Sequence, residues 1–154
     1  MTLDALAYFP DTNFWIALTF DSHSHHREAA EAYSLVSVER PAVFCRSTQQ
    51  SFLRIATTPA ILRQYSAEPF TNQDALAALD HFLAMPTVTF WDEPDGLVPL
   101  WRRLASRPTT SPKVWMDSYL AAFAISGDLR IITFDHDFKS FASSGLKFNL
   151  LESK

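Results

Sequence analysis

The sequence predicts an α/β fold in which helices cover both faces of a mainly parallel sheet. Short apolar runs have the length of buried strands, and stretches with helical periodicity separate them. The expected strands are Ala5 to Phe9, Ala42 to Cys45, Val88 to Trp91 and Leu129 to Thr133, and a final apolar run covers Lys147 to Leu151. Strands that alternate with helices favour right-handed crossovers between parallel neighbours.

Caps and helix breakers indicate the helices between these strands. Thr71 and Asp74 form a capping-box-like start for an amphipathic helix that ends near Met85. Pro59 begins a short helix, and Gly127 is expected to end the helix before the fourth strand. The other helical segments are Asn13 to Phe20, His25 to Val38, Thr48 to Ala56, Asp95 to Ser106 and Val114 to Ser126, with a Pro/Thr/Ser loop at Arg107 to Pro112.

The composition fits a single domain that spans residues 1–154. A chain of 154 residues with 47% hydrophobic and 14% aromatic content can bury a sizeable core. Cys45 is the lone cysteine and no basic stretch precedes the first apolar run, so we expect a cytoplasmic protein without an intrachain disulfide. Apolar runs such as Tyr119 to Ile125 are far shorter than the roughly 20 residues of a membrane-spanning helix, so no membrane contact is expected.

Glycine content and net charge bear on two classes of partner, nucleotides and nucleic acids. The chain has three glycines and no Gly-rich phosphate loop, which excludes the usual nucleotide-binding motifs. A net charge of −4 neither requires nor excludes a nucleic-acid partner, because binding depends on local patches and bound cations.

Four aspartates lie where a predicted strand or an apolar helix face meets polar sequence: Asp11, Asp117, Asp135 and Asp137. Parallel sheets place ligands beyond the carboxyl ends of their strands, so three of these aspartates converge if the first and fourth strands are neighbours. Asp117 shares its helix face with apolar residues, where an unpaired carboxylate is costly. Each aspartate alone could cap a helix or form a turn. As a set of hard oxygen ligands they favour Mg²⁺ or Mn²⁺ and phosphodiester hydrolysis.

Three motifs occur in an order and spacing that match a known family. They are Asp11-Thr12-Asn13 after the first strand, Trp115 to Ala122 in a helix, and Ile132 to Phe138 near the end. Over roughly Tyr8 to Leu150, the chain resembles the PIN-domain nucleases, and within them the VapC-type toxins of bacterial type II toxin–antitoxin pairs. The resemblance implies a three-layer α/β/α domain that acts as a Mg²⁺-dependent endoribonuclease. It also implies a homodimer and a cognate antitoxin whose C-terminal segment occupies the active-site groove.

The resemblance assigns the four aspartates to a metal site. Asp11 and Asp117 would bind Mg²⁺, for which Mn²⁺ can substitute, and Asp135 would complete the cluster. Asp137 would assist the cluster or hold its loop. An RNA phosphodiester would then be hydrolysed by a water that the metal activates.

Supporting roles follow from the same resemblance. Thr133 would orient a carboxylate or a water, and Asn13 would steady the first turn. The family usually has a glutamate in its third helix, and Ser51 stands at the matching position of this chain. Arg54, one turn further along the same helix face, would reach an RNA phosphate or form a structural salt bridge.

Basic and aromatic side chains leave alternatives open. A basic group flanks the loop before Asp117 and either follows a nucleic-acid backbone or is a solvated helix face; it comprises Arg102, Arg103, Arg107 and Lys113. The tryptophans are expected in the core or in interfaces, and they are Trp15, Trp91, Trp101 and Trp115. Phe14 and Trp15 would suit an interface between protomers.

Two other function classes compete with the nuclease. The missing acid at Ser51 leaves room for a catalytically weak PIN-like module that binds RNA or protein. A phosphatase with Asp11 as its nucleophile would need a second acid two residues later, and Asn13 occupies that position. The nuclease is therefore the leading interpretation, with the binding module as the alternative.

Overall fold

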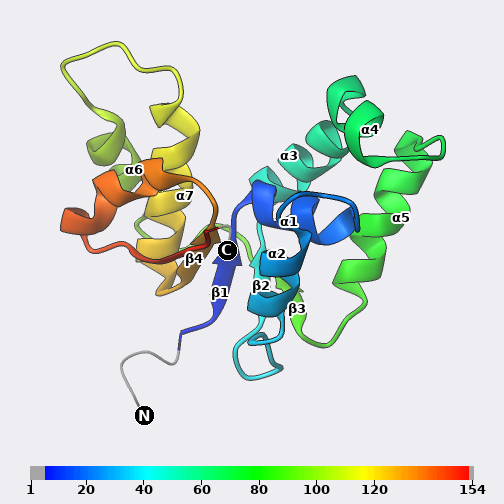
Figure 1. Cartoon of the computed structure of the whole chain (residues 1–154). Helices are drawn as coiled ribbons and strands as arrows, with labels where there is room; N and C mark the ends of the chain where they lie inside the picture. Colours follow the sequence, from blue (N-terminus) through cyan, green and yellow to red (C-terminus); the bar gives the residue numbers. More distant parts are fainter. Residues whose placement is uncertain (1–5, 153–154) are drawn as a thin grey trace.

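The computed structural model of the chain describes residues 6–152 (Figure 1). Within them, a five-stranded sheet has the order β3-β2-β1-β4-β5, and every neighbouring pair is parallel. The strands are β1 (Tyr8–Pro10), β2 (Ala42–Phe44), β3 (Val88–Phe90), β4 (Arg130–Thr133) and β5 (Lys147–Leu150). The predicted parallel α/β fold is confirmed, and the final apolar run forms its last strand.

Helices cover both faces of this sheet, as Figure 1 shows. Those on one side are α1 (Thr12–Thr19), α2 (His26–Tyr33), α3 (Arg46–Ala56), α4 (Pro59–Tyr65) and α5 (Asn72–Leu83). Those on the other side are α6 (Leu97–Ala105), α7 (Val114–Gly127) and the 3₁₀ helix η1 (His136–Ser144). No helix within the described residues is long and apolar enough to cross a membrane.

The central position of β1 places this first strand beside β4, which is far from it in the sequence. In the register of β1 and β4, Phe9 pairs with Ile131 and Pro10 pairs with Ile132. The backbone N–H of Asp11 continues this ladder by donating to the carbonyl of Ile132 at 2.9 Å. The first and fourth strands are therefore neighbours, which meets the condition for the aspartates to converge, and their carboxyl ends lie at one edge of the sheet.

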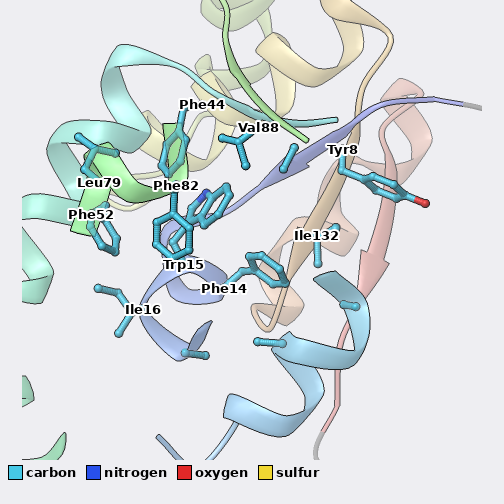
Figure 2. Packing of buried hydrophobic residues seen from close by; sticks show 14 of the residues in the cluster. Tyr8, Phe14, Trp15, Ile16, Phe44, Phe52, Leu79, Phe82, Val88 and Ile132 are labelled. Atoms are coloured by element: carbon cyan, nitrogen blue, oxygen red, sulfur yellow. The ribbon is translucent and has the colours of Figure 1, made fainter. Parts of the chain in front are cut away.

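An aromatic cluster fills the space between the sheet and helices α1 to α5 (Figure 2). The ring of Trp15 stacks on Phe44 with centroids 4.2 Å apart and contacts Phe82 at 4.9 Å. Phe14 and Trp15 are both 0% exposed. Their expected role in an interface between protomers is wrong, because helical spacing turns both side chains into the core, where they cannot reach a partner.

A second core lies between the sheet and helices α6, α7 and η1. Phe9 of β1 stacks on Phe123 of α7 with ring centroids 4.7 Å apart. Buried Ile131 and Leu97 belong to the same cluster. Packing on this face fixes α7, and with it Asp117, against the strand that precedes Asp11.

Some predicted boundaries differ from the observed ones for local reasons. The first strand was expected from Ala5, which lies outside the described residues, and the observed strand ends at Pro10. Helix α2 ends at Tyr33 rather than Val38. Leu35 and Val38 continue its apolar spacing, which led to the longer prediction, but both stay exposed in the segment before β2. Helix α3 begins before Thr48, whose hydroxyl accepts the N–H of Cys45 as part of its cap.

Helix α7 runs one residue further than predicted. Gly127 is its last residue instead of the residue after it, and Asp128 takes the left-handed conformation of the terminating turn, at φ 53°. A Cβ at Gly127 would lie 3.2 Å from side-chain atoms of Pro94 and Trp91. Glycine therefore suits the close packing here, since a Cβ would force these side chains of the segment before α6 to shift slightly, while the terminating turn falls one residue later.

Candidate active site

Asp11 caps the first helix at the carboxyl end of β1. Its Oδ1 accepts the backbone N–H of Thr12 at 2.7 Å, and its Oδ2 accepts the hydroxyl of Thr133 at 3.0 Å. Burial raises the pKa of Asp11 to about 6, against the effect of these two hydrogen bonds and with a further contribution from Asp117 and Asp135. Asp11 is thus a buried acid whose negative charge is only partly compensated by its protein neighbours.

Thr133 connects Asp11 to the loop after β4. Besides donating to Asp11, its hydroxyl oxygen accepts the backbone N–H of Asp135 at 2.9 Å and the amide of Asn13 at 3.5 Å. The side-chain oxygen of Asn13 accepts the backbone N–H of Phe134 at 3.4 Å. Thr133 is 0% exposed, so its hydroxyl is held in place by packing as well as by these partners. The contacts suit the supporting roles expected for Thr133 and Asn13.

Three further carboxylates gather beside this network. Oxygens of Asp117, Asp135 and Asp137 lie within 4.8 Å of one another. The backbone N–H of Asp137 donates to Asp135 Oδ1 at 2.9 Å, which closes a tight turn and holds both side chains on the same side of the loop. The side chains of Asp117 and Asp135 are mostly buried, whereas that of Asp137 is exposed.

The ammonium group of Lys113 lies among these three carboxylates. Its Nζ is 2.6 Å from Asp135 Oδ2, 2.5 Å from Asp137 Oδ2 and 3.6 Å from Asp117 Oδ2. The sequence placed Lys113 in a basic group without linking it to the aspartates. The signal was present, because Lys113 precedes Asp117 by four residues, the spacing of ion pairs on a helix.

The pKa values of the cluster follow from burial and from Lys113. Burial raises the pKa of Asp117, Lys113 opposes this shift, and the charge of Asp135 adds to it. Hydrogen bonding to Lys113 lowers the pKa of Asp137. Burial by itself lowers the pKa of Lys113, but its hydrogen bonds to Asp135 and Asp137 outweigh this and raise the value. One ammonium therefore faces three carboxylates, and the site keeps a net negative charge.

A divalent cation fits this donor set. Clustered carboxylate oxygens are the ligands that Mg²⁺ and Mn²⁺ prefer, and no sulfur or imidazole ligand belongs to the group found within residues 6–152. The sequence predicted Asp11, Asp117 and Asp135 as ligands. In the structure, Asp137 joins Asp117 and Asp135 in one group. Asp11 is linked to this group by the Thr133 hydroxyl, and the charges of Asp117 and Asp135 raise its pKa.

The remaining predicted residues are Ser51 and Arg54, both on α3. Ser51 is half-buried on α3, and the described residues show no hydrogen bond from it to the carboxylates. Arg54 lines a hollow of about 270 Å³ together with residues of α5 such as Leu76. A different hollow, of about 390 Å³, opens beside the carboxylates and is lined by Asp117 and Asp137. The proposed contact of Arg54 with RNA remains a prediction.

A comparison with protein-family models identifies a family for this sequence. The PIN domain model matches residues 8–143. This chain belongs to the PIN-domain family. The PIN-domain chain is also 44% identical over 144 residues to Ribonuclease VapC41 of Mycobacterium tuberculosis, which covers 92% of this chain and 96% of that protein. It is therefore a homologue of the VapC ribonucleases.

Solved structures of VapC proteins share its fold. The VapBC2 complex of Rickettsia felis, bound to a DNA fragment from its promoter, contains a chain that aligns with a TM-score of 0.67 at 12% identity, covering 96% of this chain and 100% of that one. VapC20 of Mycobacterium tuberculosis, a toxin that cleaves the sarcin–ricin loop, aligns with a TM-score of 0.63 at 18% identity, covering 91% and 96%. At these identities the likeness establishes the PIN fold alone.

Proposed function

We propose that this VapC homologue is the toxin of a VapBC-type pair and hydrolyses RNA phosphodiester bonds with Mg²⁺, for which Mn²⁺ can substitute. The observation that carries the proposal is the group formed by Asp117, Asp135 and Asp137 beside Asp11, at the carboxyl ends of neighbouring parallel strands. Identity of 44% to a ribonuclease over almost the full chain supports RNA as the substrate.

Each acidic residue has a proposed role. Asp117 and Asp135 would hold the cation, with Asp11 and Asp137 completing its surroundings. A bound Mg²⁺ would supply Lewis-acid chemistry, which neutralises charge on the phosphodiester and makes water reactive at neutral pH. The raised pKa of Asp11 favours its participation, because a buried carboxylate with few compensating donors gains most from a neighbouring cation.

Neutral and basic residues would position the acids and the substrate. Thr133 holds Asp11 and the loop of Asp135 in register through one hydroxyl group. Lys113 would keep the carboxylates together before a cation binds, and would then be available for a phosphate oxygen of the RNA. Both roles follow from its place among the three carboxylates, 2.5 to 3.6 Å from their oxygens.

The partners of this toxin would be a cognate antitoxin and a second copy of the chain. A VapBC complex among the solved structures of the same fold supports the antitoxin. Because both the RNA and the antitoxin would be met inside the bacterial cell, we propose the cytoplasm as its location.

The test is RNA cleavage by purified protein from which any co-purified protein has been removed. Total RNA with Mg²⁺ or Mn²⁺ should give discrete fragments, and EDTA or Asp117→Asn should reduce cleavage at least about 100-fold, because the substitution removes a ligand charge and keeps the shape. Asp80→Asn, on an exposed face of α5, is the matched control and should cleave like the wild type. Folded wild-type protein that leaves all RNA intact, or equal cleavage by Asp117→Asn, would contradict the proposal.

A further inference from the structure

Helix α7 presents two large apolar side chains to solvent directly before Asp117. Trp115 is 59% exposed and Met116 is 49% exposed. The backbone carbonyl of Trp115 accepts the indole N–H of Trp101 on α6 at 3.0 Å, which fixes the first turn of α7 against α6. Trp115 was expected in the core or in an interface, and burial in the core is wrong for this residue. Exposed tryptophan beside a catalytic centre needs an explanation.

A groove leads from the carboxylates toward Trp115. The hollow of about 390 Å³ beside Asp117 and Asp137 is also lined by Arg107, Ser111 and Val114. The latter three line a second hollow, of about 430 Å³, as well. The two hollows are therefore neighbours at the loop between α6 and α7.

The second hollow adjoins a third at the ends of the two helices. Ser106 and Trp115 line both of them, and the third, of about 310 Å³, is completed by Trp101 and Arg102. We call the three adjoining hollows the flanking groove. It begins at the acidic cluster and ends at the two tryptophans.

Two arginines, Arg107 and Arg102, line the flanking groove, which begins at the acidic cluster. Arg107 is held by a hydrogen bond to the Ser140 hydroxyl at 3.3 Å and by the ring of Phe141, 5.4 Å from its guanidinium carbon. Arg102 forms no salt bridge within the described residues, so its guanidinium is available to an anion. Positive charge beside an exposed indole is the combination that binds single-stranded nucleic acid, since phosphates pair with arginine and bases stack on the ring.

We propose that the flanking groove binds the single-stranded RNA next to the cleaved phosphate, with one base stacked on Trp115 and the adjoining phosphates on Arg107 and Arg102. This deepens the proposed function and rests on it for the position of the cleaved bond. The charge of the groove favours RNA over an apolar protein segment, because its two arginines would be left unpaired by an apolar partner. Stacking is tolerant of sequence, so this end of the groove selects unpaired RNA rather than a particular base.

The experiment measures binding of a fluorescent 12-nucleotide single-stranded RNA by anisotropy, with Ca²⁺ in place of Mg²⁺. Trp115→Ala should weaken binding about five- to tenfold, while Trp115→Phe, which keeps an aromatic face, should stay within about twofold of the wild type. Leu35→Ala is the control, because Leu35 is equally exposed, at 58%, but lies just after α2, outside the groove. Arg102→Gln should make the dependence of log Kd on log salt shallower by about 0.7.

A second RNA of the same length that carries abasic sites isolates the stacking contribution. The difference between wild type and Trp115→Ala should disappear with this RNA, because it has phosphates but no base to stack. Equal weakening with both RNAs, or unchanged binding of the base-bearing RNA, overturns the proposal. Unchanged RNA binding with a changed molecular mass of Trp115→Ala by light scattering overturns it in favour of a protein interface.

The two proposals fail in different ways. If wild-type protein cleaves RNA in Mg²⁺ while Trp115→Ala binds RNA normally, the groove assignment is wrong and the nuclease stands. If Trp115→Ala weakens binding of base-bearing RNA alone but wild-type protein never cleaves, the groove assignment stands and the nuclease is wrong. Thermal unfolding of Trp115→Ala should match that of the wild type, because the side chain is mostly exposed.

Discussion

Asp11 should make the metal-free protein less stable as the pH rises. Its pKa is raised from 3.8 to about 6 in the folded state, a difference of 6 − 3.8 = 2.2. At about 1.4 kcal/mol for each pH unit of difference, ionised Asp11 lowers the free energy of unfolding by about 3 kcal/mol. The sign follows from proton binding: between the two pKa values the folded protein holds more protons than the unfolded chain, so stability falls as the pH rises.

The pH window follows from the same two values. The Asp11 contribution is most favourable below pH 3.8, falls as the pH passes through about 6, and is then constant. Between pH 5.0 and pH 7.5 the expected loss is about 1.4 kcal/mol. Asp11→Asn is neutral at both pH values and removes this dependence. The Asn keeps an acceptor for Thr12 but turns a donor toward Thr133, so only the change with pH is diagnostic.

Urea unfolding in EDTA, followed by tryptophan fluorescence, measures the effect. The stability of Asp11→Asn relative to the wild type should increase by about 1.4 kcal/mol from pH 5.0 to pH 7.5. Asp80→Asn, at an exposed position, should show no such increase. Addition of Mg²⁺ at pH 7.5 should stabilise the wild type more than Asp11→Asn. A difference between wild type and Asp11→Asn that stays constant with pH would refute the reasoning.

Two further substitutions test other parts of the structure. Lys113→Met removes the ammonium that lies among three carboxylates, so calorimetry should show Mn²⁺ binding about tenfold more tightly; unchanged affinity would mean that Lys113 does not compete with the cation. Asp128→Gly should raise the free energy of unfolding by about 0.5–1 kcal/mol, because Asp128 takes a left-handed conformation at φ 53°, and thermal unfolding at a lower temperature would count against this.

Local pattern was sufficient for the fold because each element carries its own signal. Buried strands such as Ala42–Phe44 are continuous apolar runs after a proline or a polar turn. Thr71 and Asp74 form the cap of α5, and their spacing in the sequence predicts it. Boundaries were harder where packing decides. Gly127 resembles a helix stop, but close contact with Trp91 and Pro94 from a distant segment gives it another role.

The sequence predicted which acidic residues lie near one another, but not the distances between them. Parallel strand order was enough to bring Asp11 near Asp135, but it could not rank the ligands. Side-chain geometry decides the tight turn that aligns Asp137 with Asp135. It also decides the hydrogen bonds that Lys113 donates to both of them. Exposure of Trp115 was also not readable, because α7 is apolar on all sides and its sequence does not show which side faces solvent.

The place of β1 in the middle of the sheet has a consequence for the timing of synthesis. Asp11 and Thr133 share a hydrogen bond but are 122 residues apart in the chain. While the ribosome is still making the chain, β1 has no β4 beside it, and the acidic residues of the C-terminal loop do not yet exist. An unfinished or truncated chain therefore lacks the complete site. Because such distant pairing forms slowly, a newly made chain passes through an interval in which it has no complete site and is inactive.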